Sequence, residues 1–205
     1  LKNFPEKIVL ATGNVGKLKE INELFAAIPT DIAAQGEFGI ESPEETGQTF
    51  MENALLKARY AVQQTGLPAI ADDSGLSVDA LDGRPGVHSA RYAGEDATDA
   101  QNIDLLLKEL DSVAEDLRDA GFHCAVALVF PDDKHAPLIA QGVWRGQILR
   151  QREGIGGFGY DPVFYDKAEH KTGAQMSRTE KNAVSHRGRA FSALLPQVEA
   201  LLEKN

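Results

Sequence analysis

The sequence has one cysteine, no long apolar run and no excess of positive charge, and each absence excludes a class of protein. With Cys124 alone among 205 residues, an intrachain disulfide is impossible, and we expect a reducing compartment, the cytoplasm. The apolar run 125–130 is far shorter than the roughly 20 residues that cross a bilayer, so we expect no membrane span. The formal net charge of −10 disfavours nonspecific binding to nucleic acid. A phosphate-bearing ligand would therefore need a local cluster of lysines and arginines.

The arrangement of apolar residues predicts an α/β protein with a mixed β-sheet. Hydrophobic residues make up 42% of the chain, the usual globular share, so we expect one domain over 1–205 or two lobes that share a sheet. The last two strands should form an antiparallel hairpin, because turn-forming residues join them. The segments with the length and composition of strands are 7–11, 69–71, 77–81, 122–130 and 138–148.

Helix signals lie between and after these strands. Apolar residues recur at helical spacing over 18–25. The sequences 49–52 and 98–101 are capping boxes, and the first of these two helices should end near Gly66. The segment 177–180 opens a long helical region at the C-terminus.

A loop between the first strand and the first helix is a candidate site for phosphate groups, because backbone N–H groups and a helix N-terminus favour anions. It is not a Walker A loop, since Leu18 stands where that motif has a magnesium-binding serine or threonine. A glycine-containing turn with a surface lysine is the alternative. The loop consists of Thr12, Gly13, Asn14, Val15, Gly16 and Lys17.

Two adjacent carboxylates follow the strand 69–71. Asp72 and Asp73 can point to different sides of one cleft, so that one binds metal while the other handles protons. Magnesium prefers a few carboxylates, water and phosphate oxygens, so histidine and cysteine are not required. Glu44 and Glu45 can supply a third carboxylate, or can simply be acids at a helix start. A polar turn is the alternative for Asp72 and Asp73.

A glycine-rich segment ends in Phe158, Gly159, Tyr160 and Asp161. The glycines allow close approach to a planar ligand, on which Phe158 can stack, and Asp161 can accept hydrogen bonds from ring N–H groups. The alternative is a connection whose aromatic side chains enter the core.

A group of hydrogen-bond donors follows near the C-terminus. It contains Lys181, His186 and Arg187. Because Arg187 can only donate, it would favour a 6-keto oxygen over the 6-amino group of adenine. A solvated basic helix end is the alternative. Lys57 and Arg91 could also reach phosphate, although for both we expect a place on the solvated surface.

Five short motifs, taken in order, resemble the inosine triphosphate pyrophosphatase (Ham1/RdgB) family, and they span nearly the whole chain. No position with an expected role departs from the family's pattern. The motifs are 12–17, 44–47, 72–75, 158–161 and 185–188.

The resemblance implies a magnesium-dependent pyrophosphatase that converts non-canonical purine triphosphates (ITP, dITP, XTP and dXTP) to the monophosphate and pyrophosphate, which cleanses the nucleotide pool. Magnesium would be held at Glu45 and Asp73, with Asp72 close by, and Asp73 would be the general base. Loop 12–17 would bind the phosphates, and Ser74 would also contact the substrate.

At the other end of the nucleotide, residues 158–161 would enclose the base, and Lys181, His186 and Arg187 would read its 6-keto edge. The family fold is a long mixed β-sheet flanked by helices, with two lobes around a central substrate cleft, and usually forms a homodimer. Two alternatives are a Maf-type pyrophosphatase acting on pyrimidine nucleotides and a nucleotide-binding regulator without turnover.

Overall fold

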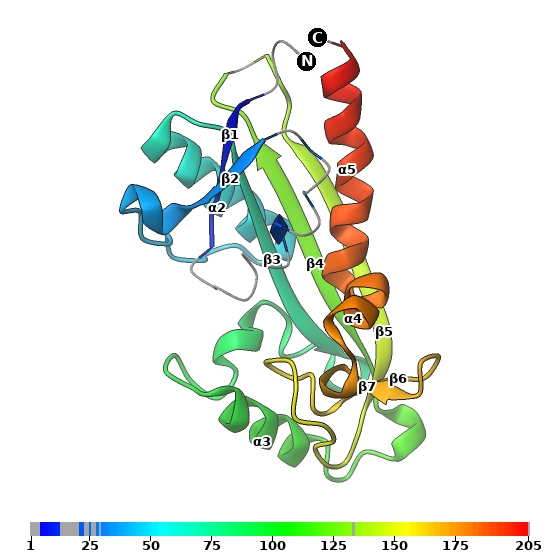
Figure 1. Cartoon of the computed structure of the whole chain (residues 1–205). Coiled ribbons are helices and arrows are strands. Elements are labelled where there is room, and N and C mark those ends of the chain that lie inside the picture. The colour runs from blue at the N-terminus through cyan, green and yellow to red at the C-terminus, as the bar shows by residue number, and fades with distance from the viewer. Residues whose placement is uncertain are drawn as a thin grey trace. The chain divides into compact units, whose positions relative to one another are not determined.

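A computed structural model describes residues 5–12, 21, 22, 25, 28, 30–132 and 134–204, and Figure 1 shows its helices and strands. Most of the helix expected over 18–25 falls outside these residues. The strands are β1 (Lys7–Leu10), β2 (Asp31–Ala34), β3 (Ala69–Val78), β4 (Asp119–Val129), β5 (Leu138–Ile148), β6 (Phe164–Asp166) and β7 (Lys171–Thr172). The described α-helices are α2 (Phe50–Thr65), α3 (Asp99–Glu109), α4 (Arg178–Val184) and α5 (His186–Lys204). Short 3-10 helices lie at Gln35–Phe38, Asp79–Leu81, Gly86–Arg91, Glu115–Leu117 and Gly173–Gln175.

The strands form one sheet in the order β2-β1-β3-β4-β5-β6-β7. β1 is parallel to β2 and β3, with Val9 opposite Ala33 and Ala69. β6 is antiparallel to β5 and β7, with Tyr165 opposite Gln147 and Thr172. The prediction of a mixed sheet in an α/β protein is therefore confirmed.

The expected break after residue 71 is wrong, because β3 runs without interruption from Ala69 to Val78. Asp72 and Asp73 lie inside this strand, 2% and 6% exposed, rather than in a turn at its end. The strand 77–81 is also wrong: its first two residues end β3, and the remainder is a 3-10 helix. Buried carboxylates are stable inside a strand only when neighbouring segments bring cations or hydrogen-bond donors to them, and the local sequence does not show which segments those are.

The helix boundaries agree with the local signals. Thr49 and Thr98 accept hydrogen bonds from the backbone of the third helical residue, and both capping boxes are complete. Gly66 ends α2 in the left-handed conformation with φ of 66°. Ser177 caps α4, but the extended backbone of Ser185 separates α4 from α5, so the C-terminal region is two helices. No helix of the described part is long and apolar enough to cross a bilayer.

The chain divides into two compact units. Unit 1 contains residues 1–73, 124–142 and 187–205, and unit 2 contains residues 74–123 and 143–186.

In unit 1 the sheet is covered on two faces, because successive strand residues point to opposite sides. Ile8, Leu10 and Ile70 pack in one cluster with Phe191 and Leu194 of α5. The residues between them on β1 and β3 pack in another cluster with Ala58 and Ala61 of α2. Cys124 of β4 is 2% exposed and belongs to the cluster on the α5 side of the sheet. Asp72 and Asp73 continue this alternation, so their side chains leave β3 towards different helices.

Unit 2 has its own apolar core, which includes Leu76, Ile103 and Leu106 together with the aromatic residues Trp144 and Phe164. A buried arginine joins three of its segments. Arg118 is 1% exposed and donates to the carbonyls of Leu110, Ile148 and Leu149 at 2.6, 2.8 and 3.0 Å. These contacts satisfy carbonyl groups that would otherwise lose their hydrogen bonds on burial.

Candidate active site

Two carboxylates of unit 1 converge on one ammonium group. The Nζ of Lys57 on α2 lies 2.6 Å from Oε1 of Glu45 and 3.1 Å from Oδ1 of Asp73. Asn53, one helical turn earlier on α2, donates from Nδ2 to Oδ2 of Asp73 at 3.1 Å. The predicted metal ligands Glu45 and Asp73 are thus brought together, and a cationic group already lies between them. We call Glu45, Asn53, Lys57 and Asp73 the acidic centre.

The charges of the acidic centre shift the pKa of both buried partners. Burial lowers the pKa of Lys57, but the attraction of Asp73, Asp72 and Glu45 outweighs it, so the pKa lies above its ordinary value and the ammonium stays charged. Burial raises the pKa of Asp73, and repulsion by Glu45 adds to this, whereas Lys57 and Asn53 lower it; the pKa is raised on balance. A carboxyl with a raised pKa is a stronger base than an ordinary aspartate.

The neighbouring Asp72 faces α5, on the opposite side of the sheet in the described part of unit 1. Its Oδ2 lies 3.5 Å from Nε of Arg187 near the start of α5, and both side chains are almost fully buried. The adjacent carboxylates therefore do point to different sides, one towards Lys57 and one towards Arg187. Arg187, which we expected at the base of the nucleotide, contacts a carboxylate of the acidic motif.

Of the expected phosphate loop, the structure describes only Thr12. It is half-buried after β1, and its backbone N–H donates to the carbonyl of Leu10 at 3.0 Å. Gly13, Asn14, Val15, Gly16 and Lys17 lie outside the described residues. Ser74, the first residue of unit 2, is half-buried within β3.

In unit 2 three of the residues expected at the base contact one another. Lys181 donates from Nζ to Oδ2 of Asp161 at 2.5 Å, and Nζ lies 4.6 Å from the centre of the Phe158 ring. The same Oδ2 accepts the backbone N–H of Phe158 at 2.9 Å. Asp161 therefore fixes Lys181 and the Phe158 backbone, a role we did not foresee for it. The Phe158 side chain stays on the surface, with 41% of the residue exposed.

The glycine-rich segment folds closely around the Asp161 carboxylate. A Cβ added at Gly157, where φ is 73°, would lie 2.1 Å from Oδ2, and one added at Gly173 would lie 2.7 Å from Oδ1. Both glycines are required by this close approach. Tyr160 is 4% exposed and donates its hydroxyl to the carbonyl of Ser89 at 2.8 Å, so its side chain is part of the core. Gly159 donates its backbone N–H to Oδ2 of Asp99 at 2.6 Å.

His186 lies in unit 2 among aromatic side chains. It is 5% exposed, and its ring is parallel to that of Phe122, with 4.8 Å between the ring centres and 12° between the planes. The motif 185–188 predicted this histidine as a site residue, but no motif marked the aromatic rings around it.

The roles of Lys57 and Asn53 were not predicted from the sequence. We expected Lys57 on the solvated surface, but it is 7% exposed and belongs to the buried face of α2. A signal was present, because Lys57 follows Ala54 by three residues and precedes Ala61 by four, the spacing of one helix face. Arg91 is partly exposed, and its Nε lies 3.5 Å from Oε1 of Glu95. Glu95 is not one of the predicted site residues.

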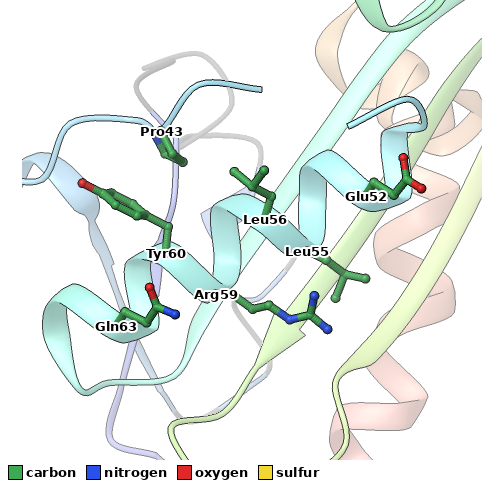
Figure 2. Close-up of a pocket in the computed structure, with 7 residues that line it drawn as sticks. All are labelled: Pro43, Glu52, Leu55, Leu56, Arg59, Tyr60 and Gln63. Carbon is green, nitrogen blue, oxygen red and sulfur yellow. The ribbon is translucent and has the colours of Figure 1, made fainter. Parts of the chain in front are cut away.

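Among the described residues, no group of three or more histidine, cysteine, aspartate or glutamate side chains is arranged to bind a metal ion. A pocket does lie along α2 (Figure 2), but it contains none of the predicted site residues. Its one carboxylate, Glu52, accepts the backbone N–H groups of Gln48 and Thr49 as part of the helix cap. The acidic centre is therefore a better candidate for chemistry. The pocket is lined by Pro43, Glu52, Leu55, Leu56, Arg59, Tyr60 and Gln63.

Known proteins resemble this chain over almost its whole length. The "dITP/XTP pyrophosphatase" of Shigella flexneri is 54% identical over 93% of this chain and 96% of its own, and that of Yersinia pseudotuberculosis is 55% identical over the same shares. The solved structure of a HAM1 protein from Coxiella burnetii has a TM-score of 0.88 and 48% identity, and covers 96% of this chain and 98% of that one. The model of the Ham1 family matches residues 8–197. With that match and these identities, the chain belongs to the Ham1 family.

Proposed function

We propose that this chain is a nucleoside-triphosphate pyrophosphatase that hydrolyses non-canonical purine triphosphates, such as ITP, dITP and XTP, to the monophosphate and pyrophosphate. Its curated relatives are named for the dITP and XTP reaction. The observation that carries the proposal is the acidic centre, where Glu45 and Asp73 both lie within about 3 Å of one cationic group. A nucleotide-binding regulator without turnover would have little use for buried acids that repel a triphosphate.

The metal ion of this reaction is proposed to be Mg²⁺, held by Glu45 and Asp73. The donor set fits, because both are hard oxygen ligands that together already face one positive charge. Magnesium often takes only one or two protein carboxylates and completes its shell with water and substrate phosphate, so a cluster of three acids is not needed. When bound, the ion supplies positive charge to the phosphate oxygens.

Asp73 is proposed as the general base. Its carboxylate would take a proton from the water that attacks the α-phosphorus, while the bond from that phosphorus to the bridging oxygen breaks and pyrophosphate leaves. Asn53 and Lys57 fix the two Asp73 oxygens by hydrogen bonds, which limits rotation of the carboxylate. Its raised pKa makes Asp73 a stronger base than an ordinary aspartate.

The remaining predicted residues are proposed as substrate contacts. Phosphate groups would bind the loop 12–17, and Ser74 would also contact the substrate. Phe158 offers an exposed ring on which the base could stack. Residues 159–161 would enclose the base with their backbone, because the Tyr160 hydroxyl and one Asp161 oxygen already make hydrogen bonds within unit 2.

Selection of the base is proposed to depend on three donors. Lys181, His186 and Arg187 would donate towards the 6-keto edge of hypoxanthine or xanthine. Adenine would place an amino group there instead, which leaves donors without acceptors at a cost of about 1–3 kcal/mol for each mismatch.

We further propose that residues 1–205 act as one catalytic domain, in a homodimer, in the cytoplasm. The single domain is supported by the coverage of a solved Ham1 structure, 96% of this chain and 98% of that one, and the cytoplasm by the single buried cysteine, which suits a reducing compartment. Light scattering on the purified protein gives the mass that decides between monomer and dimer.

The deciding experiment measures the phosphate product released from ITP with and without magnesium. We expect one pyrophosphate for each ITP, loss of activity with EDTA, and recovery on addition of Mg²⁺. Release of orthophosphate would make the chain an ordinary phosphatase, and equal rates with UTP or CTP would favour the Maf-type alternative. The Asp73→Asn variant reports any contaminating activity.

A further inference from the structure

The imidazole of His186 lies against flat side chains of β4 and β5 in unit 2. The Phe122 ring on β4 lies parallel to it, 4.8 Å between centres, and the Trp144 indole on β5 is also nearly parallel, at 6.4 Å and 11°. Phe122 and Trp144 are 8% and 1% exposed. Three nearly parallel rings therefore share one buried cluster, which we call the aromatic stack: Phe122, Trp144 and His186.

A buried carboxylate, that of Asp166, fixes the Trp144 ring of the aromatic stack. The Nε1 of Trp144 donates to Oδ2 of Asp166 at 2.6 Å. The other oxygen, Oδ1, accepts the backbone N–H groups of Ala168 and Glu169 at 2.7 and 3.1 Å. Asp166 is itself 6% exposed, so both ends of this contact are buried. The indole plane cannot turn without breaking a buried hydrogen bond, and its orientation is passed on to the rings that pack against it.

The orientation of an imidazole ring is not fixed by its own backbone, because the terminal torsion of histidine has a broad preference. A ring N–H must nevertheless point at its acceptor, since a hydrogen bond weakens steeply when its angle falls below about 120°. Aromatic pairs with offset parallel rings supply that missing restraint. We infer that Phe122 is a positioning residue, which holds the His186 ring in the plane needed to donate to a 6-keto oxygen and thereby sets purine selectivity. This inference rests on the proposed function.

The test compares Phe122→Leu with a matched variant, Phe164→Leu. Phe164 belongs to the same cluster, with ring centres 4.6 Å from Phe122 and 4.7 Å from Trp144, and is fully buried. Both changes remove the same atoms from the same core, so loss of stability alone would affect them alike. Thermal melts check that both variants are folded at the assay temperature.

The readout is the ratio of kcat/KM for ITP to that for ATP. In Phe122→Leu we expect this ratio to fall about threefold to tenfold, a range that matches the strength of one aromatic pair. The loss should come from ITP, because ATP makes no 6-keto contact with His186. Phe164→Leu should lower kcat/KM for ITP and for ATP by the same factor. Phe122→Tyr, which retains the aromatic ring, should leave the ratio of the two unchanged.

A second measurement does not depend on activity. The ring-proton signals of His186, assigned by comparison with His186→Asn, should be shifted upfield by the parallel rings, and Phe122→Leu should move them downfield. Unchanged signals, or an unchanged ITP-to-ATP ratio in a folded Phe122→Leu variant, would overturn the inference while wild-type pyrophosphate release still supports the proposed function. A wild-type protein that releases no pyrophosphate would instead refute the proposed function, and this role of Phe122 with it.

Discussion

Replacing Lys57 by methionine removes the positive charge from the acidic centre and keeps nearly the length of the side chain. The Lys57 and Asp73 side chains are each only 9% exposed, and their ion pair is 3.1 Å long. Removing one partner of a buried ion pair costs about 3–5 kcal/mol, because the other charge stays buried without compensation. The Glu45 side chain is 26% exposed, so water screens part of its repulsion. We therefore expect Lys57→Met to lower the free energy of unfolding by about 3 kcal/mol, the lower end of that range.

The loss should depend on pH with a definite sign. Without Lys57, the pKa of Asp73 rises further above its unfolded value, because burial and Glu45 repulsion are no longer opposed by the ammonium. A group with a raised folded pKa favours the folded state in acid, and that contribution is lost as pH rises through the folded pKa. The variant should therefore lie closer to wild type at pH 5 than at pH 8.

Urea denaturation at both pH values, in EDTA and in magnesium, measures these effects. Magnesium should stabilise Lys57→Met more than wild type, since the two carboxylates no longer share their oxygens with an ammonium. A magnesium concentration 100 times its Kd would raise the free energy of unfolding by about 2.7 kcal/mol. Lys108→Met, on the exposed face of α3, is the control and should stay within about 0.5 kcal/mol of wild type. If Lys57→Met is as stable as wild type at pH 8, the buried ion pair does not have the role assigned to it.

Three further predictions concern other groups. Asp73→Asn should lower kcat for ITP by about 10²- to 10⁴-fold with a smaller change in KM, because the general base is lost and most substrate contacts remain. Steady-state kinetics measures both constants, and near-normal turnover would show that Asp73 is not the general base. Arg118→Met should lower the free energy of unfolding by about 3 kcal/mol in urea, since two buried carbonyls and one partly buried carbonyl lose their donor, whereas exposed Arg59→Met should not. Burial, followed by the hydrogen bond and charge of Glu109, raises the pKa of Tyr92 to about 12. The contribution of Tyr92 to stability should therefore be present below pH 10 and be lost as pH rises through 12. Ultraviolet titration should show the Tyr92 phenolate forming at a lower pH in Glu109→Gln than in wild type.

Features that depend on a few neighbouring residues could be predicted from the sequence. The caps at Thr49, Thr98 and Ser177 and the left-handed Gly66 were visible because each is completed within about four residues. The mixed sheet could also be predicted, from the order and length of the apolar runs. The residues of the candidate site were found by resemblance of five motifs, since each motif alone had an ordinary structural explanation.

The tertiary structure decided how those residues are used, because burial and charge compensation depend on segments far apart in the chain. The sequence by itself determined that Asp72 and Asp73 are adjacent and that Lys57 lies on a helix. Only the fold brings Lys57 to Asp73 and Arg187 to Asp72, across 16 and 115 positions, and so allows two carboxylates to lie inside a continuous strand. The parallel rings of Phe122 and Trp144 at His186 come from three elements in the same way, and no local pattern marks them.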